Sequence, residues 1–131
     1  MSHYQRRIGV DFDGVIHRAR KGRLDGSIYD EPNFEVLDGI RSLLSDGYIV
    51  FVYSARNSHE IFDWTNSLQP KLEFPLKIIP QDAAHWDEIN VLGITRKKYA
   101  ALIYIDDHGF HFSGSWTDAM QEWQRRIRKL S

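Results

Sequence analysis

Three short apolar runs in this chain stop at polar or acidic side chains, and this repeated pattern restricts the fold more than any other feature. The runs cover residues 8–10, 48–53 and 100–105. Runs of this kind, rich in β-branched and aromatic residues, are typical of strands buried on both faces of a parallel sheet. We therefore predict a strand at each run, with Asp11, Ser54 and Asp106 at the carboxyl ends.

Amphipathic segments lie between these predicted strands. From Pro32 to Gly47 apolar side chains recur every three or four residues, which predicts a helix that starts near the proline and stops at the glycine. A second helix is predicted from Ser58, as its N-cap, to the residue before Pro70. A further short strand is predicted over residues 76–79.

The rest of the chain divides into one ambiguous and one clear segment. Residues 81–92 fit either a loop or a single helical turn. Ser115-Trp-Thr-Asp118 is a capping box, and the apolar spacing that follows it predicts a last helix.

Strands that alternate with helices predict an α/β fold, a Rossmann-like parallel sheet with helices on both faces. The 131 residues suit one core, so a single domain is predicted over residues 1–131. The chain has no cysteine, which excludes disulfides and thiolate metal sites, and its net charge of -1 argues against a surface built wholly for nucleic acid. No apolar run approaches the ~20 residues that span a bilayer, and a signal peptide is not apparent, which favours a cytoplasmic protein without membrane contact.

Polar side chains at the carboxyl ends of parallel strands meet at one edge of the sheet, where ligands of such folds bind. Here they are Asp11, Asp13, Ser54, Asp106 and Asp107. Crowded carboxylates raise one another's pKa values unless a cation lies between them, and magnesium is the cation that prefers such oxygen ligands. The sequence therefore predicts a magnesium site.

A carboxylate can attack phosphorus and form an aspartyl-phosphate, and Asp11 is the candidate nucleophile. Asp13, two residues on, is the candidate general acid and base. The phosphoryl oxygens need hydroxyl and cationic donors, which Ser54 and either Lys97 or Lys98 can supply, with Lys98 preferred.

These motifs, in this order, resemble the haloacid dehalogenase (HAD) superfamily of phosphohydrolases. The matching residues are Asp11-Phe-Asp-Gly14, Val52-Tyr-Ser54, Lys97 or Lys98, and Ile105-Asp-Asp107, over about four fifths of the chain. The resemblance implies Asp11 as nucleophile and metal ligand and Asp13 as acid/base and as a ligand through its backbone carbonyl. It also implies Ser54 and Lys98 at the phosphate, and Asp106 and Asp107 at magnesium.

The resemblance further implies a small member without a large cap domain, because no segment is long enough for one. An uncapped site suits a macromolecular substrate or a homo-oligomer whose partner covers it, and both stay open. The substrate classes are phosphorylated small molecules, nucleotides and nucleic-acid 3'-phosphates. The last class is suggested by Ser54-Ala-Arg56, which is similar to a motif of polynucleotide 3'-phosphatases.

Several alternatives stand beside this interpretation. Arg56 is interpreted equally as a substrate contact and as a structural ion pair. The basic residues 18–23 fit a solvated loop better than a grip on a polyanion, and His17 fits packing better than substrate contact. The competing functions are a phosphoacceptor signalling domain and a metal- or phosphate-binding protein without turnover.

Overall fold

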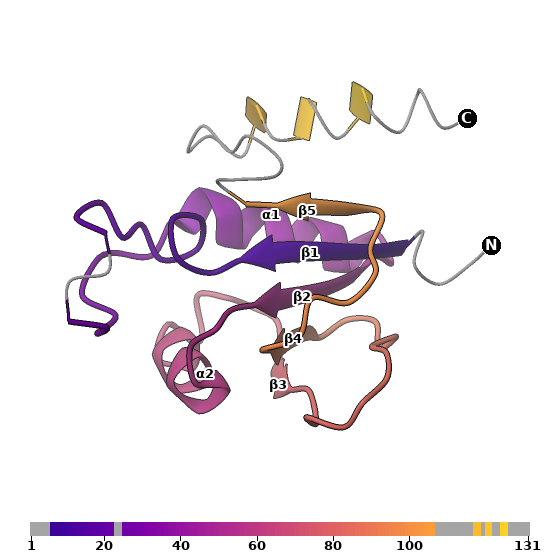
Figure 1. Ribbon diagram of the computed structural model, residues 1–131. Helices are drawn as coiled ribbons and strands as arrows, with labels where there is room; N and C mark the ends of the chain where they lie inside the picture. Colours follow the sequence, from indigo (N-terminus) through magenta and orange to yellow (C-terminus); the bar gives the residue numbers. More distant parts are fainter. Residues whose placement is uncertain (1–5, 23–24, 107–116, 119, 122–123, 126–131) are drawn as a thin grey trace.

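The computed structural model has a Rossmann-like α/β fold with a five-stranded, all-parallel sheet (Figure 1). It describes residues 6–22, 25–106, 117–118, 120–121 and 124–125. The strand order is β3-β4-β2-β1-β5. The strands are β1 (Arg7–Asp11), β2 (Ile49–Tyr53), β3 (Leu76–Ile78), β4 (Leu92–Thr95) and β5 (Ile103–Ile105).

Strand β1 lies where the strand order reverses, with β2 on one side and β5 on the other. In register, Asp11 pairs with Tyr53 of β2, and Val10 pairs with Ile105 of β5. Asp11 and Asp106 thus occupy adjacent positions on neighbouring strands. A switch point of this kind is where parallel sheets leave a crevice for ligands.

One face of the sheet is covered by helices α1 (Phe34–Ser45) and α2 (Ser58–Asn66). The buried side of α1 repeats at helical spacing and packs on alternate strand residues such as Val10 and Val52. Ile61 and Thr65 are the buried positions of α2, and Ile61 joins the same cluster. Both helices therefore share one core.

The opposite face is covered by chain segments without helix among the described residues. Ile49 and Phe51 of β2 form a second cluster there with Ile79, Trp86 and Tyr99, which lie in or next to the connections on either side of β4. The prediction of helices on both faces is therefore not met in the part of the chain that is described. Aromatic side chains from loops fill the place of a helix.

Strand β4 was missing from the sequence prediction, which left the residues before Leu92 ambiguous. Its sequence, Leu-Gly-Ile-Thr, is short and contains a glycine, which is depleted in strands. The glycine has a packing reason. A Cβ built on Gly93 would lie 2.7 Å from Ile79 Cδ1 and 2.7 Å from Trp86 Cε2.

Helix α1 starts two residues later than predicted and α2 one residue earlier, because asparagines supply the caps. Asn33, not Pro32, precedes α1, and its side chain accepts a hydrogen bond from the Val36 N–H. Asn57, not Ser58, caps α2 by accepting from the His59 N–H. The remaining predicted strands agree with β1, β2, β3 and β5, although β5 is shorter than predicted.

The last predicted helix is described only in part. Residues 117–118, 120–121 and 124–125 are helical, and Met120 packs against the cluster under α1. The Thr117 N–H donates to Glu35 Oε1 at 3.0 Å, which ties this segment to the start of α1. Ser115 and the predicted apolar positions after Met120 lie outside the described residues.

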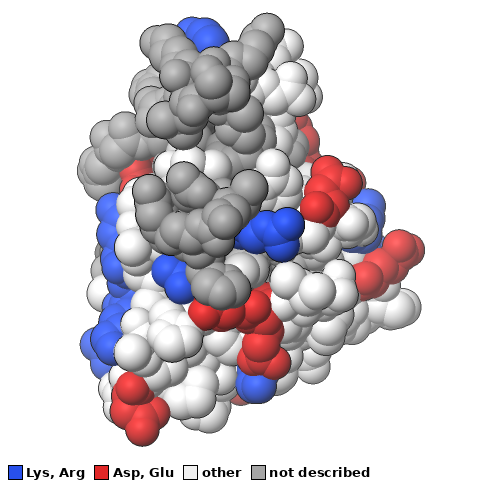
Figure 2. All heavy atoms as spheres, turned by 90° about the vertical axis from the view of Figure 1, so that its right-hand side faces the viewer, with Lys and Arg blue, Asp and Glu red and all other residues white. Residues whose placement is uncertain are grey.

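Figure 2 shows the surface at the amino ends of the strands, where acidic and basic side chains both occur and neither kind covers the face. The polar strand ends described below lie at the opposite edge of the sheet. No helix within the described residues has the length and hydropathy of a membrane span.

We predict that Gly93→Ala destabilises the protein by about 1–3 kcal/mol, because the new methyl overpacks the Trp86 face. The gain of up to about 1 kcal/mol from a less flexible unfolded chain is smaller. Urea unfolding with an unchanged slope would measure this loss. In the background of Trp86→Phe, which has a smaller ring, the same substitution should cost less, and equal costs in both backgrounds would contradict the packing explanation.

Candidate active site at the carboxyl edge of the sheet

A tight helical turn directly after β1 brings His17 back beside Asp13. The Phe12 carbonyl accepts hydrogen bonds from the N–H groups of Val15, Ile16 and His17. His17 then forms isolated bridges with Asp13 and with Pro32. Residues 18–22 and 25–31 lie between these bridges, beyond the carboxyl ends of the strands (Figure 1), and are called the excursion below.

His17 fixes one oxygen of Asp13. The ring is fully buried, and its Nδ1 lies 2.8 Å from Asp13 Oδ1. On the other side, the Asp30 N–H donates to His17 Nε2 at 3.0 Å. Since Nε2 accepts, Nδ1 carries the proton and donates to Asp13, so the backbone at Asp30 sets the tautomer.

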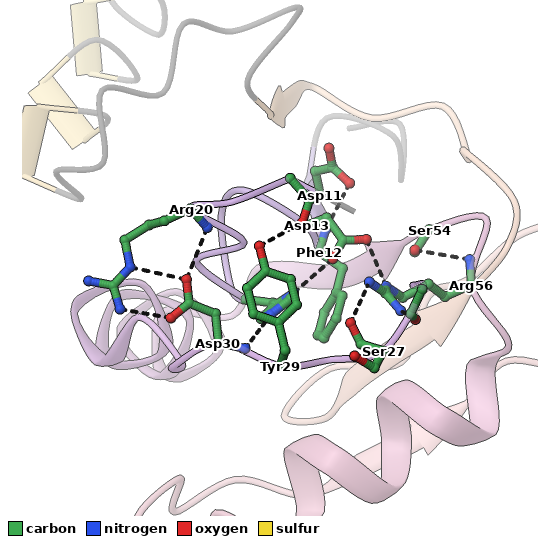
Figure 3. Close-up of polar contacts among 12 residues, drawn as sticks. Asp11, Phe12, Asp13, Arg20, Ser27, Tyr29, Asp30, Ser54 and Arg56 are labelled. Atoms are coloured by element: carbon green, nitrogen blue, oxygen red, sulfur yellow. Dashed lines mark hydrogen bonds and ion pairs between the residues drawn. The ribbon is translucent and has the colours of Figure 1, made fainter. Parts of the chain in front are cut away.

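Arg56 fixes the other oxygen of Asp13 (Figure 3). Its Nε donates to Asp13 Oδ2 at 2.8 Å, and only 2% of its side chain is exposed. The remaining guanidinium donors reach the carbonyls of Gly26 and Ser27, in the excursion after β1. Arg56 therefore forms the structural ion pair, which was one of its two interpretations, and its donors do not face an open site.

Asp13 is held as a carboxylate. Partial burial opposes its ionisation, but the hydrogen bonds from Arg56 and His17, together with the charge of Arg56, outweigh burial and lower its pKa below the ordinary value. An ionised Asp13 with two ordered partners is better prepared to accept a proton than to donate one.

Ser54 lies at the end of β2, half-buried, in a short bend. Its hydroxyl accepts a hydrogen bond from the Arg56 N–H at 3.1 Å (Figure 3), and its own N–H donates to the Thr95 carbonyl at 3.1 Å. The hydroxyl proton remains available for a donor role, because accepting from Arg56 uses only a lone pair.

A second polar group lies across β1 from Ser54. Tyr53 donates its hydroxyl proton to Asp106 Oδ2 at 2.5 Å, and Lys98 Nζ lies 3.8 Å from the same oxygen. The Lys98 ammonium also lies 4.4 Å from the centre of the Tyr104 ring and 5.2 Å from that of Tyr53. These contacts hold the cation at the strand ends, although 52% of the lysine side chain stays exposed.

Burial, followed by the hydrogen bond to Asp106, raises the pKa of Tyr53 far above its ordinary value. The charge of Asp11 contributes in the same direction, which places the Tyr53 ring near both carboxylates. Tyr53 therefore stays a neutral hydrogen-bond donor across the working pH range of a protein.

The two candidate lysines point to different places. Lys97 Nζ donates to the Ala83 carbonyl at 3.1 Å, away from Asp106, whereas Lys98 lies beside it. Lys98 is therefore the one of the two that lies at the strand ends. Asp107, predicted as a metal ligand, lies outside the described residues.

The carboxylates of the described residues can supply only part of the ligand shell of a magnesium ion. No group of three or more described His, Asp or Glu side chains could hold a metal ion by itself. Asp13 has both oxygens engaged, and the other described carboxylates at this edge are Asp11, whose Oδ1 accepts from the Phe12 N–H, and Asp106, whose Oδ2 accepts from Tyr53. One or two carboxylates are enough when waters and a substrate phosphate complete the octahedron, so the oxygen-only donor set fits magnesium bound together with substrate.

Three residues of this arrangement were not assigned a site role from the sequence: His17, Tyr53 and Tyr104. Side chains alternate between the two faces of a strand, so Tyr53 lies on the same face of the sheet as its register partner Asp11. This alternation is the sequence signal that could have identified Tyr53 as a site residue. In the basic stretch, Arg20 forms a bidentate pair with Asp30, as expected for a solvated loop. No family model, curated protein or solved structure matches the chain.

We predict that Arg56→Met costs about 3–5 kcal/mol of stability, because it leaves Asp13 and two carbonyls without their donor. Chemical unfolding measures the loss. Arg56→Lys should recover only part of it, because one ammonium cannot replace the planar fork. The matched control is Arg20→Met in the same excursion, whose exposed side chain should leave the midpoint unchanged; equal losses at the two positions would contradict the role of Arg56.

We also predict a pH signature of Asp13. Because its pKa is lower in the folded protein than its ordinary value of 3.8, its ionisation stabilises the fold above that value. This contribution disappears as the pH falls through the folded-state pKa, so it is lost below 3.8. Unfolding midpoints measured down to acidic pH should therefore fall less steeply in Asp13→Asn than in wild type, while Asp38→Asn, at an exposed carboxylate, should follow wild type.

Proposed function

We propose that this protein is a magnesium-dependent phosphomonoester hydrolase of the HAD type, which forms an aspartyl-phosphate on Asp11. The observation that carries the proposal is the convergence at one sheet edge. Asp11 ends the central strand, Asp13 follows in the next turn, and Asp106 with its bound Lys98 ends the neighbouring strand. Ser54 ends the strand on the other side.

In the first half-reaction, an oxygen of Asp11 attacks phosphorus as the bond from phosphorus to the ester oxygen breaks. A covalent acyl-phosphate forms, and the ester oxygen takes a proton from water and leaves as the alcohol. Asp11 suits this role because its backbone pairs with Tyr53 of β2 and the preceding Val10 pairs with Ile105 of β5, which orients the nucleophile before substrate arrives.

The charge on the transferring phosphoryl oxygens needs donors that are already in place. Lys98 supplies a cation held by Asp106 and two aromatic rings, yet half exposed toward ligand. Ser54 supplies a hydroxyl proton from the opposite side. Arg56 has an indirect role, because it orients Asp13 and supports the bend that carries Ser54.

In the second half-reaction, water hydrolyses the acyl-phosphate. Asp13, which is ionised and has both oxygens ordered, accepts the proton of that water. Hydrolysis returns the Asp11 carboxylate and releases inorganic phosphate.

Magnesium would be held by Asp11 and Asp106, with Asp107 as the further carboxylate that the sequence supplies. When bound, it supplies charge that neutralises the phosphoryl oxygens and allows two carboxylates to approach a dianion. The substrate is a phosphomonoester, whether a small metabolite, a nucleotide or a nucleic-acid 3'-phosphate.

The proposal predicts that phosphate release from p-nitrophenyl phosphate requires magnesium, is abolished by EDTA, and falls at least about a thousandfold in Asp11→Asn. Asp38→Asn, an exposed carboxylate on α1, is the matched control and should keep full activity.

The outcomes separate this proposal from its rivals. Phosphate that stays bound to Asp11 in stoichiometric amount, without turnover, would instead favour a phosphoacceptor signalling domain. Magnesium binding with neither turnover nor phosphorylation would favour a protein that only binds metal or phosphate. Full activity in Asp11→Asn would rule out the nucleophile.

A further inference from the structure

A groove of about 930 Å³ lies at the same edge of the sheet, beyond the ends of β3 and β4. Its walls come from the start of α2, the residues after β3 and the residues after β4. Its volume is in the range of pockets that hold a nucleotide or a sugar phosphate. None of the predicted catalytic residues lines it.

The groove adjoins the phosphoryl site directly. Thr95, which lines the groove, accepts the hydrogen bond from the Ser54 N–H at 3.1 Å. Asn57, on the opposite wall, follows Ser54 by three residues. A substrate whose phosphoryl group contacts Ser54 would therefore extend its remaining part into this groove.

The groove carries excess positive charge. Arg96 and Lys97 both line it and both are exposed, and Arg96 pairs with no described residue. Lys97 is anchored by the Ala83 carbonyl and by the Tyr99 ring, 5.8 Å from Nζ, which leaves further N–H donors on its ammonium. Asp82 is the one carboxylate among the lining residues.

Part of the lining has a different character. Ile78, Ile79 and Pro80 contribute apolar surface to the groove. Apolar surface with a few charged groups at one end is the usual lining for an organic group that carries an anion.

We propose that this groove binds a second phosphate, carried by the leaving group of the substrate, and that Arg96 and Lys97 contact it. This inference rests on the proposed phosphatase function for the identity of the first phosphate, and it narrows the substrate class to organic bisphosphates. Charge-assisted hydrogen bonds to two cations give such substrates their preference over monophosphates.

The test measures binding rather than turnover, in full-length Asp11→Asn with magnesium present. Isothermal titration calorimetry compares adenosine 3',5'-bisphosphate with adenosine 3'-monophosphate, and fructose 1,6-bisphosphate with fructose 6-phosphate. The two pairs distinguish a nucleoside from a sugar as the organic part. The bisphosphate of at least one pair should bind about tenfold more tightly than its monophosphate.

Three substitutions and a control identify the contact. Arg96→Ala and Lys97→Ala should each remove most of the bisphosphate preference while leaving monophosphate affinity unchanged. Asp82→Asn should increase the preference, since it removes the opposing charge. Lys71→Ala, an exposed lysine beside Phe34 on α1, is the control and should change nothing.

Equal affinity for bisphosphate and monophosphate in both pairs would overturn the proposal. So would a preference that survives Arg96→Ala and Lys97→Ala, or the absence of binding by all four compounds. A clear bisphosphate preference in a protein that hydrolyses nothing would keep the groove and refute only the phosphatase function, so the two failures are distinguishable.

Discussion

The partly buried carboxylate of Asp13 is the group on which the geometry of this sheet edge depends. Through His17 it fixes the turn after β1, and through Arg56 it fixes the bend after β2. Both partners also bind the backbone of the excursion, at Asp30 and at Gly26 and Ser27. One ionised side chain thus connects three segments that are distant in sequence. A buried pair of this kind contributes little net stability, but it selects one arrangement.

A second constraint is the charge balance across β1. Asp11 lies between the Asp13 network and the Asp106 group, and each neighbouring carboxylate already has a cation or a hydroxyl donor. Repulsion among the carboxylates is therefore reduced at Asp13 and Asp106 by protein groups. This division gives the three carboxylates different environments, which is how identical side chains acquire different chemical roles.

Much of the fold followed from local pattern. Strands β1, β2 and β5 and helix α1 could be predicted from the sequence, because the spacing of their apolar residues matches the positions that are buried in the fold. Strand β4 could not, since its glycine is explained by the side chains of Ile79 and Trp86, which pack over it from the preceding connection. The sequence also did not predict that loops cover one face of the sheet. The reason is the same, because aromatic side chains that pack from distant loops leave no periodic pattern in the sequence.

The candidate site divides in the same way. Parallel topology alone brings Asp11, Ser54 and Asp106 to one edge, so their proximity was predictable. The partners of Asp13 were not, because a histidine four residues on and an arginine after β2 have many possible contacts. Their roles depend on the path of the excursion between β1 and α1, which local propensity does not determine.

The two described tryptophans lie in different cores, and this gives the protein built-in optical reporters. Trp64 packs edge-on against Phe12, with ring centres 5.4 Å apart, and lies 5.8 Å from His17, so its emission depends on the turn that holds Asp13. Trp86 lies in the second cluster, over Gly93. In variants that keep only one of the four tryptophans, emission from Trp64 or from Trp86 would follow the rearrangement of one layer, and the order in which the two layers assemble during refolding would become visible without an attached dye.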